Sequence, residues 1–339
     1  MKPSGRATIS DVAARAGVSR TTVSKLFNGH GSVSEATAVR IRDAAAKLNW
    51  TPSAAAVALR SSRARTVGLV VNRNLGVTTA ESLISGIEYV LSRHGYGLLY
   101  YEVDAVGTEE AELYRRLADT RKVDGVILTN SRVGDTRFKL MRDIGLPAVL
   151  IGTPWRDDPI PHLDAVPPGA GVPESVAHLA QLGHRHIAYV GGPEDQYQAL
   201  ARHRAFEAAM VAAGLKPFAV VETDYSPHMA ADVTDRLLSR KSAPSAIIYA
   251  GDRMAIAGMH TARRRGLKLP EDLSIVGFDG IEVGAWVEPS LTTVERDPTL
   301  RGRAVAAMLL RLLGEDFDDE YPLPTQTLTV RRSTAPPRA

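Results

Sequence analysis

The stretch TISDVAARAGVSRTTVSKLFNG (residues 8–29) predicts two short helices joined by a tight turn. Thr8 precedes Asp11 by three residues, a pair typical of a helix start because both side chains can satisfy free backbone amides. Gly17 follows an apolar stripe and can adopt the left-handed conformation that ends a helix. Ser19 can then cap a second helix. Two short helices around a glycine-containing turn are typical of a helix-turn-helix unit.

A third helix is predicted to begin at Ser34 and to end before Pro52, whose ring disfavours a helical conformation at Thr51. Its apolar residues recur at helical spacing, so one face can pack against the first two helices. Three amphipathic helices of this length can close one small core. The sequence therefore predicts an all-helical domain over residues 1–52.

The second predicted helix has a polar face opposite an apolar one. An α-helix fits the major groove of DNA, where residues in its first turns meet base edges and short hydrogen-bonding side chains meet phosphates. We expect base contacts from Arg20, Thr21 and Lys25. A polar face that only meets solvent is the alternative. The residues expected to contact phosphates are Ser19, Thr22, Ser24, Asn28 and Ser34.

The net charge of +3 conceals a strong asymmetry along the chain. Residues 1–65 hold eleven Lys and Arg residues against three acidic residues, a balance of +8, whereas the remainder holds 30 against 35, a balance of −5. A small basic module before a larger acidic body is typical of a polyanion-binding head. A basic targeting arm is the alternative, but these cations are spread through a periodic apolar pattern.

The alanine-rich segment SAAAVALRSSRAR (residues 53–65) follows the predicted head. A helix this short is only marginally stable by itself in water. We therefore expect a hinge that becomes helical only when something holds it, and a plain flexible linker is the alternative.

The body, residues 66–339, alternates short β-branched runs with helical patterns, which predicts parallel sheets built of βαβ units. The runs fall into two successive sets. We therefore expect two similar α/β lobes, with a crossover near Trp155 to Asp164 and late strands at LTTV and QTLTVRR. The two sets are TVGLVV, GLLYYEV, GVILT and PAVLIG, then HIAYVGG, FAVVETD, AIIYAG and LSIVGFD.

Ligands of open parallel sheets bind beyond the carboxyl ends of the strands. The residues that end the predicted runs include carboxylates, amides and an aromatic ring, which suit a small polyhydroxylated molecule. Each of them alone could instead cap a helix or lie in a surface turn. The strand-end candidates are Asn72, Arg73, Asn130, Ser131, Asp224, Tyr225, Asp252 and Asp279.

Other kinds of chemistry have little support in the sequence. The chain has no cysteine, no apolar run long enough to span a membrane and no secretory signal, so we expect a cytoplasmic protein. No catalytic or cofactor-binding motif is present, and we expect neither an enzyme nor a cofactor.

His184 and His186 are spaced like neighbours on one face of a strand, but a third metal ligand is missing. We therefore expect structural hydrogen bonds there and no metal.

Residues 8–52 resemble the head of the LacI/GalR (lactose-repressor) family of bacterial transcription factors. Later stretches resemble the body of the same family, so the resemblance covers nearly the whole chain. It implies a helix-turn-helix DNA-binding domain followed by a two-lobed, periplasmic-binding-protein-like effector domain. The later stretches are QLGHRHIAYVGGP, YAGDRMAIAGM, PEDLSIVGFD and PSLTTV.

The resemblance also implies roles for individual residues. It selects the same three base readers on the second helix. It implies that paired hinge helices enter the minor groove of DNA, with Ala56 and Leu59 in contact and Leu59 as an apolar wedge between base pairs. It implies effector contacts by Arg202, Tyr225 and Asp279.

The chain departs from the family pattern in both predicted sites. The hinge has Ser53 and Val57 where many relatives have Asn and Arg. Gly251 and Ala165 stand where an Asn is common next to an Asp. These departures leave the hinge contacts to DNA and the identity of the effector open.

The resemblance and the residues together favour a repressor whose operator binding is controlled by a small effector such as a sugar. The C-terminus has no heptad pattern, so we expect a homodimer on a palindromic operator. An activator or a ligand-independent regulator is the alternative. A solute-binding protein, which would need export, is a more remote one.

Overall fold

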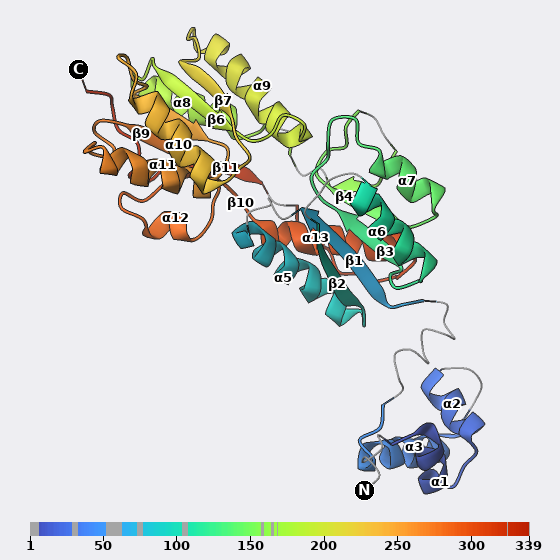
Figure 1. Ribbon diagram of the computed structural model, residues 1–339. Coiled ribbons are helices and arrows are strands. Elements are labelled where there is room, and N and C mark those ends of the chain that lie inside the picture. Colours follow the sequence, from blue (N-terminus) through green and yellow to red (C-terminus); the bar gives the residue numbers. More distant parts are fainter. Residues whose placement is uncertain are drawn as a thin grey trace, which may run out of the picture. The chain divides into compact units, whose positions relative to one another are not determined.

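A computed structural model of the chain (Figure 1) describes residues 7–28, 33–51, 63–72, 77–103, 108–156, 159–163, 166–167, 169–323 and 325–338. The chain forms two compact units, Met1–Arg65 and Thr66–Ala339. Ala56 and Leu59, expected in the hinge, lie outside the described residues. None of the described helices is both long and apolar enough to cross a membrane.

The described part of the first unit contains the three helices α1 (Ile9–Ala16), α2 (Arg20–Asn28) and α3 (Glu35–Lys47). α1 begins with a capping box, in which the Thr8 N–H donates to Asp11 Oδ2 at 2.7 Å and the Asp11 N–H donates to Thr8 Oγ1 at 3.4 Å. α1 ends at Gly17, whose φ of 67° is left-handed and favours glycine. The predicted helix-turn-helix is confirmed.

One small core joins these helices. Val12 on α1, Val23 on α2 and Ile41 on α3 are fully buried in it. Phe27 meets Trp50 edge to face, with 5.2 Å between the ring centroids. Phe27 is 36% exposed, so the apolar side of α2 extends from the core to its rim.

The end of α3 is set by Asn49 and not, as predicted, by Pro52. Asn49 is left-handed, with a φ of 47°, and the Trp50 N–H donates to the Ala45 carbonyl at 2.9 Å. This is the Schellman pattern that terminates a helix, and asparagine tolerates its left-handed residue. The helix therefore ends before the proline can act.

The second unit has two lobes, each built on a mainly parallel sheet, as predicted. In the first lobe all strands of the sheet run parallel, in the order β2-β1-β3-β4-β5 (Figure 1). The strands are β1 (Thr66–Asn72), β2 (Gly97–Val103), β3 (Gly125–Leu128), β4 (Ala148–Ile151) and β5 (His162–Leu163), and the connecting helices are α5 (Val77–Arg93), α6 (Thr108–Asp119) and α7 (Arg137–Asp143).

The second lobe has the strand order β11-β10-β9-β8-β6-β7, in which β11 alone is antiparallel to its neighbour. β6 and β8 are buried along their whole lengths, as expected for central parallel strands covered on both faces. The strands are β6 (Ile187–Gly191), β7 (Ala219–Glu222), β8 (Ala246–Tyr249), β9 (Ser274–Asp279), β10 (Thr292–Arg296) and β11 (Gln326–Thr329). The helices are α8 (Val172–Gln181), α9 (Tyr197–Ala212), α10 (Pro227–Leu238), α11 (Asp252–Arg264) and α12 (Val283–Trp286).

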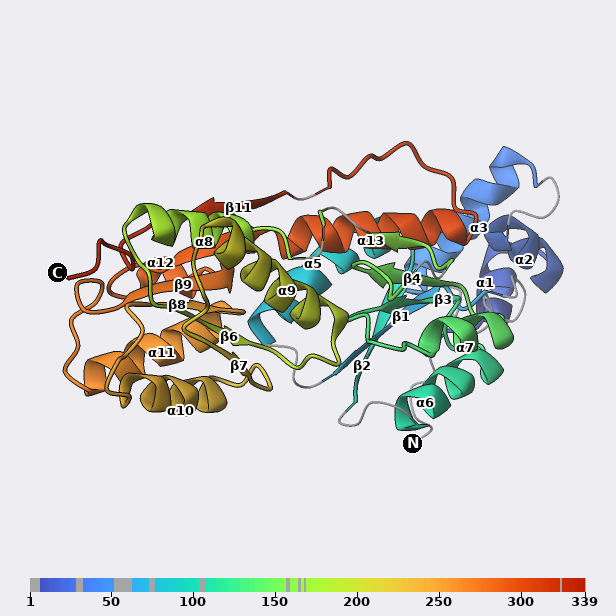
Figure 2. The same ribbon diagram turned by 90° about the horizontal axis from the view of Figure 1, so that it is seen from above.

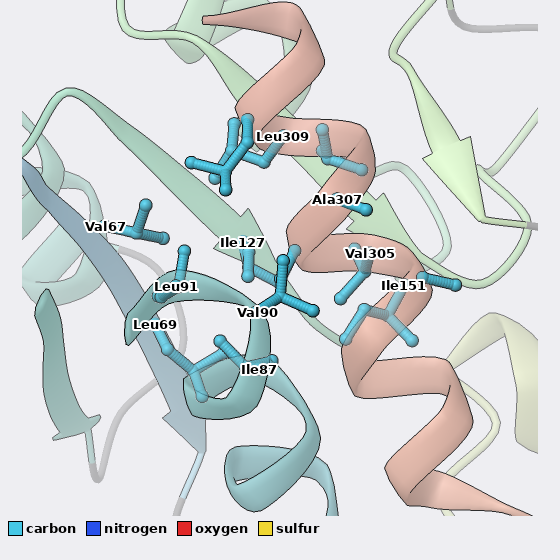
Figure 3. Packing of buried hydrophobic residues seen from close by; sticks show 14 of the residues in the cluster. Val67, Leu69, Ile87, Val90, Leu91, Ile127, Ile151, Val305, Ala307 and Leu309 are labelled. Carbon is cyan, nitrogen blue, oxygen red and sulfur yellow. The ribbon is translucent and has the colours of Figure 1, made fainter. Parts of the chain in front are cut away.

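Helix α13 (Pro298–Leu312) follows a strand of the second lobe but packs in the first lobe (Figure 2). It lies beside α5 and buries Val305 and Leu309 against the sheet (Figure 3). The two helix backbones approach closely, since a Cβ on Gly86 would lie 2.1 Å from the Thr299 carbonyl oxygen. The buried side chains of α13 are therefore part of the core of the first lobe.

The chain passes between the lobes after β5, after β10 and after α13. The first passage lies later than predicted, because β5 falls inside the segment expected to cross over. Leu150 of β4 pairs with His162 of β5, and the Gly152 N–H donates to the Leu163 carbonyl at 3.0 Å. His162 and Leu163 therefore still belong to the first lobe.

Candidate functional site

The exposed face of α2 carries the three residues expected to read bases. Arg20, Thr21 and Lys25 are all exposed, whereas Val23 is fully buried on the opposite side of the helix. Ser24 is half-buried between the two faces. The core thus fixes which side of α2 points outward, and that side offers two cations and a hydroxyl from a rigid helix.

Three of the residues expected to contact phosphates form hydrogen bonds at helix starts. Ser19 Oγ accepts the Thr22 N–H at 3.0 Å and lies 2.8 Å from the Thr22 hydroxyl. Ser34 Oγ accepts the Thr37 N–H at 3.4 Å and donates to the Thr37 hydroxyl at 2.9 Å. These caps stabilise the two helices whose N-termini, with their free N–H groups, also attract anions.

Two carboxylates of the first unit, those of Asp11 and Glu35, have local partners. Hydrogen bonds from the Thr8 side chain and backbone lower the pKa of Asp11. The exposed Glu35 carboxylate lies 3.4 Å from Arg42. Neither carboxylate is on α2, so the charge on the outer face of α2 comes from Arg20 and Lys25. Asn28 belongs to α2, but its side chain lies outside the described part of the chain.

A cavity lies between the two lobes of the second unit. It holds about 480 Å³ of space, part of which is open solvent. Its walls come from the ends of first-lobe strands, the first crossover, the start of α9, the ends of β9 and β10, and the segment before β11. The lining residues are Gly152, Thr153, Leu163, Val166, Pro167, Gly169, Gln198, Arg202, Phe278, Arg296, Arg301, Thr325 and Gln326.

Arg202, on α9, is a cavity-lining residue that is only 6% exposed. One of its Nη1 hydrogens is donated to the Ala250 carbonyl at 2.9 Å. Its guanidinium carbon lies 3.7 Å from the centroid of the Phe278 ring, a cation–π contact. Both contacts are with uncharged groups, and they hold the guanidinium in one orientation.

Tyr225 and Asp279 lie close to Arg202. Burial raises the pKa of the Tyr225 hydroxyl, the charge of Arg202 lowers it and that of Asp279 raises it, so all three side chains share one electrostatic environment. The Tyr225 ring covers Gly192, where a Cβ would lie 2.0 Å from the ring. Asp279 Oδ1 lies 2.5 Å from Arg296 Nη2. The structure therefore gathers these predicted residues at the carboxyl end of the second sheet.

Asp252 is a neighbour of Asp279, whose charge acts on it, but it does not line the cavity. It is 1% exposed, its Oδ1 accepts the Thr293 hydroxyl at 2.5 Å, and its Oδ2 accepts the Ile281 N–H at 2.8 Å. A Cβ on Gly277 would lie 2.1 Å from its carboxylate, so the side chain is packed against β9. Burial raises the pKa of Asp252 to about 7. Its carboxylate ties the loop after β9 to β10 and is not part of the cavity lining.

Asn130 belongs to a different hollow, in which residues of the first lobe meet the segment before α9. It is left-handed, with a φ of 52°, and its carbonyl accepts Arg137 Nη2 at 2.8 Å. Asp224 is exposed and accepts the Ser226 N–H at 2.8 Å, which is the surface turn named as the alternative. The side chain of Asn72 lies outside the described part of the chain, as does Arg73.

The two lobes touch beside the cavity. The Tyr197 N–H donates to the Ser131 carbonyl at 2.9 Å, and the Val133 N–H donates to the Asp195 carbonyl at 2.8 Å. The Trp155 ring meets the Tyr197 ring edge to face, with 5.3 Å between centroids. A change in the separation of the lobes must therefore alter these contacts.

Sequence reasoning missed Arg296 and Phe278, although both lie at strand ends. Arg296 ends β10, and the strand-end rule would have selected it had the predicted strand LTTV been extended by two residues. The structural role expected for His184 is confirmed, because its ring bonds to Ser245 at 2.9 Å and to the Ala335 carbonyl at 2.9 Å. No group of three or more potential metal ligands occurs within the described ranges.

Two family descriptions match the chain. "Bacterial regulatory proteins, lacI family" matches residues 8–53, and "Periplasmic binding protein-like domain" matches residues 176–334. The HTH-type transcriptional repressor PurR of Aliivibrio fischeri (strain MJ11) is 31% identical over 335 residues, 97% of this chain and 98% of the relative. The HTH-type transcriptional regulator CelR of Thermobifida fusca is 31% identical over 337 residues, with the same coverage of both chains.

Two solved structures are similar to this chain over nearly its whole length. A lac repressor dimer bound to operator and the anti-inducer ONPF has a TM-score of 0.84 at 25% identity, covering 98% of this chain and 100% of that one. The CelR–cellobiose complex has a TM-score of 0.71 at 28% identity, covering 97% of this chain and 100% of that one. The predicted fold class and family resemblance are confirmed.

Proposed function

We propose that this chain, which belongs to the LacI family of bacterial regulatory proteins, is a repressor that binds its operator as a homodimer under the control of a small ligand in the inter-lobe cavity. As a member of this family it is a DNA-binding transcriptional regulator with an effector domain and not an enzyme. The observation that carries the proposal is the exposed polar face of α2 on a basic helix-turn-helix unit.

The proposed division of labour follows the chain. Residues 1–52 bind the operator, residues 53–65 form the hinge, and residues 66–339 bind the effector and dimerise. In the hinge, Ala56 contacts the minor groove and Leu59 enters a base step as an apolar wedge. Binding to the chromosome places the protein in the cytoplasm.

On the operator, Arg20, Thr21 and Lys25 read base edges in the major groove. Their exposure on a helix fixed by its own core supports this role. The N-termini of α2 and α3, capped by Ser19 and Ser34, face the DNA backbone, where their N–H groups and hydroxyls bind phosphate oxygens. The residues proposed for phosphate contacts are Ser19, Thr22, Ser24, Asn28 and Ser34.

Arg202 in the cavity wall and its neighbours Tyr225 and Asp279 contact the effector. Asn72 and Asn130 offer amide groups from the first-lobe strand ends when the lobes close on it. Asp252 acts on the effector site through the loop it holds, because its carboxylate is bonded to Thr293 and Ile281. The complex of CelR with cellobiose supports a sugar as the effector.

Effector binding changes the separation of the lobes and thereby the geometry of the two hinges in the dimer. A coupling of this kind is typically about 1–3 kcal/mol, or roughly 5- to 150-fold in affinity. Whether the ligand releases or strengthens DNA binding depends on the lobe arrangement it prefers. The contacts of Tyr197 with Ser131 and Trp155 are the ones that must adjust.

Selection of random duplex DNA by the full-length protein, followed by sequencing, tests this function. We expect a two-fold symmetric site with a flexible step at its centre, as two heads and two wedges require. The selection is run with and without a small-molecule extract of the bacterium that encodes the protein. Absence of enrichment under both conditions would contradict the proposal.

A further inference from the structure

We infer that Glu110, on α6, is a positioning residue for the contact between the two lobes. It holds two arginines that shape the loop after β3, residues 129–135, and the backbone of this loop touches the second lobe. The inference rests on the proposed function, in which the separation of the lobes controls the hinges. It identifies side chains that help to set that separation.

The lobes meet in a short antiparallel bridge between the loop after β3 and the segment before α9. Arg132 pairs with Gln196, and backbone hydrogen bonds of Ser131 and Val133 to the second lobe flank this pair. Two such hydrogen bonds from alternate residues form only when both segments are extended and in register. The loop must therefore have one particular shape before the second lobe can pair with it.

The backbone of the loop does not favour this shape by itself. Asn130 and Gly134 are both left-handed, with φ values of 52° and 70°. This conformation is uncommon for a residue with a Cβ, although asparagine tolerates it better than most. The loop therefore needs side-chain contacts to hold it in one conformation.

An arginine and an aspartate at the end of the loop supply the first of these contacts. The Arg137 guanidinium donates to the Thr129 carbonyl at 2.9 Å and to the Asn130 carbonyl at 2.8 Å. Its Nη2 also lies 2.7 Å from Asp135 Oδ2. The Asp135 carboxylate accepts the Arg132 N–H at 3.2 Å. This ion pair therefore fixes the backbone at the start of the loop and at the residue that forms the bridge.

Glu110 joins the ion pair from another element. Its Oε2 lies 2.7 Å from Arg132 Nη1, and its Oε1 lies 3.4 Å from Arg137 Nη1. The Glu110 side chain is only 3% exposed, and that of Asp135 only 1%. Two carboxylates thus balance two guanidinium groups almost without water. Loss of one charge would leave another buried without its partner, which is strongly unfavourable.

Stability alone does not account for this network, because apolar side chains of similar volume often stabilise a protein as well as buried ion pairs do. A fully hydrogen-bonded polar network instead favours one arrangement of its members. Arg132 passes this arrangement to the bridge, since its side chain binds Glu110 and its backbone pairs with Gln196. Loss of the Glu110 charge should therefore weaken the bridge and favour a wider separation of the lobes.

The test compares Glu110→Gln with Glu112→Gln, a change at an exposed position on the same helix. Hydrogen exchange of the full-length protein, without ligand or DNA, is followed by mass spectrometry in peptides that contain Val133 or Tyr197, whose amides form the bridge. We expect Glu110→Gln to lower the protection of these amides about 10- to 100-fold. Glu112→Gln should leave it unchanged.

Trp155 provides a second readout, because its ring meets the Tyr197 ring of the second lobe with 5.3 Å between centroids. The chain has three tryptophans, so Trp50→Phe together with Trp286→Phe leaves Trp155 as the only one. In that background acrylamide should quench the fluorescence more strongly after Glu110→Gln, because wider separation of the lobes exposes the Trp155 ring.

A second variant keeps the test decisive where Glu110→Gln does not fold. Arg132→Met removes the guanidinium at the partly exposed edge of the network and should change both readouts in the same direction by a smaller amount. Unchanged protection of the Tyr197 amide in the folded variants would overturn the inference and leave the proposed function intact. Loss of protection confined to the first lobe would also overturn it, because a purely local role of Glu110 predicts that pattern.

The same variants distinguish this inference from the proposed function. The Kd of Glu110→Gln for the selected operator is measured beside that of the wild type. A weakened bridge together with an altered Kd would support both. A weakened bridge with an unchanged Kd would support the positioning role of Glu110 and contradict the control of DNA binding by the lobes.

Discussion

Arg296, the last residue of β10, pairs with Asp279, the last residue of the neighbouring strand β9, with 2.5 Å between Nη2 and Oδ1. The pair ties the two parallel strand ends together at the edge of the cavity. Asp279 has a φ of 106°, a conformation that residues with a Cβ rarely adopt. The ion pair therefore holds a strained backbone at the place where the effector is proposed to bind.

Replacing Asp279 by Asn should lower the free energy of unfolding by about 1–3 kcal/mol, because Arg296 is then left mostly buried without its counter-charge. Asn keeps the shape and tolerates positive φ better than most residues. The measurement is a double-mutant cycle with Arg296→Met by chemical denaturation. Costs of the two single changes that simply add in the double variant would contradict the coupling.

Asp252 should make the stability of the second unit depend on pH. Its pKa is raised by burial to about 7 from an ordinary value of 3.8. Between these values the native state holds a proton that the unfolded state has lost, so the free energy of unfolding falls as pH rises from about 4 to 7, by at most about 4 kcal/mol. Denaturation curves of Asp252→Asn should lack this part of the slope. Identical pH profiles for the variant and the wild type would contradict the assignment.

Ser19 should serve stability and DNA binding separately. Asp caps a helix as well as Ser does, so Ser19→Asp should leave hydrogen exchange of the α2 amides unchanged, whereas Ser19→Ala should weaken protection by about 1 kcal/mol. A carboxylate facing a phosphate is repelled, so Ser19→Asp should lower operator affinity about tenfold. Full affinity in Ser19→Asp would show that this helix start does not face the DNA backbone.

Arg20, a proposed base reader, and Arg63, which we expect to contact phosphates from the hinge, should differ in what they contribute to DNA binding. Arg20→Ala should relax base preference at one operator position and cost about 1–3 kcal/mol there. Arg63→Ala should weaken binding to all sequences and reduce the salt slope by about one. Fluorescence anisotropy with the selected site, its single-base variants and several salt concentrations separates the two effects. An equal loss on every sequence for both variants would contradict the assigned roles.

Much of the fold could be predicted because local sequence determines it. The capping pair Thr8 and Asp11 and the glycine at 17 act within one or two turns, and the predicted helix-turn-helix follows from them. The predicted end of α3 was wrong, because the left-handed Asn49 ends the helix before Pro52 is reached. The first-lobe position of α13 could not be predicted, because apolar periodicity does not tell which sheet a helix covers.

In the candidate site, reasoning from the residues alone could predict only those that follow a strand. Tyr225 and Asp279 follow buried strands, and the structure brings them near Arg202 as the family resemblance implied. Asp252 also follows a strand, yet its side chain turns toward Gly277, which has room for a carboxylate only because it lacks a side chain. Such a direction depends on tertiary packing. For the same reason the contacts of Arg202 with Phe278 and with the Ala250 carbonyl became visible only in the structure.

The central claim is that the cavity controls DNA binding. The most direct measurement is the Kd of the full-length protein for its selected duplex, by fluorescence anisotropy at fixed salt, with and without the small-molecule extract used in the selection. The account predicts a change of roughly 5- to 150-fold in the wild type and none in Arg202→Met. A wild-type Kd that is the same with and without an extract that raises the melting temperature of the protein would contradict it.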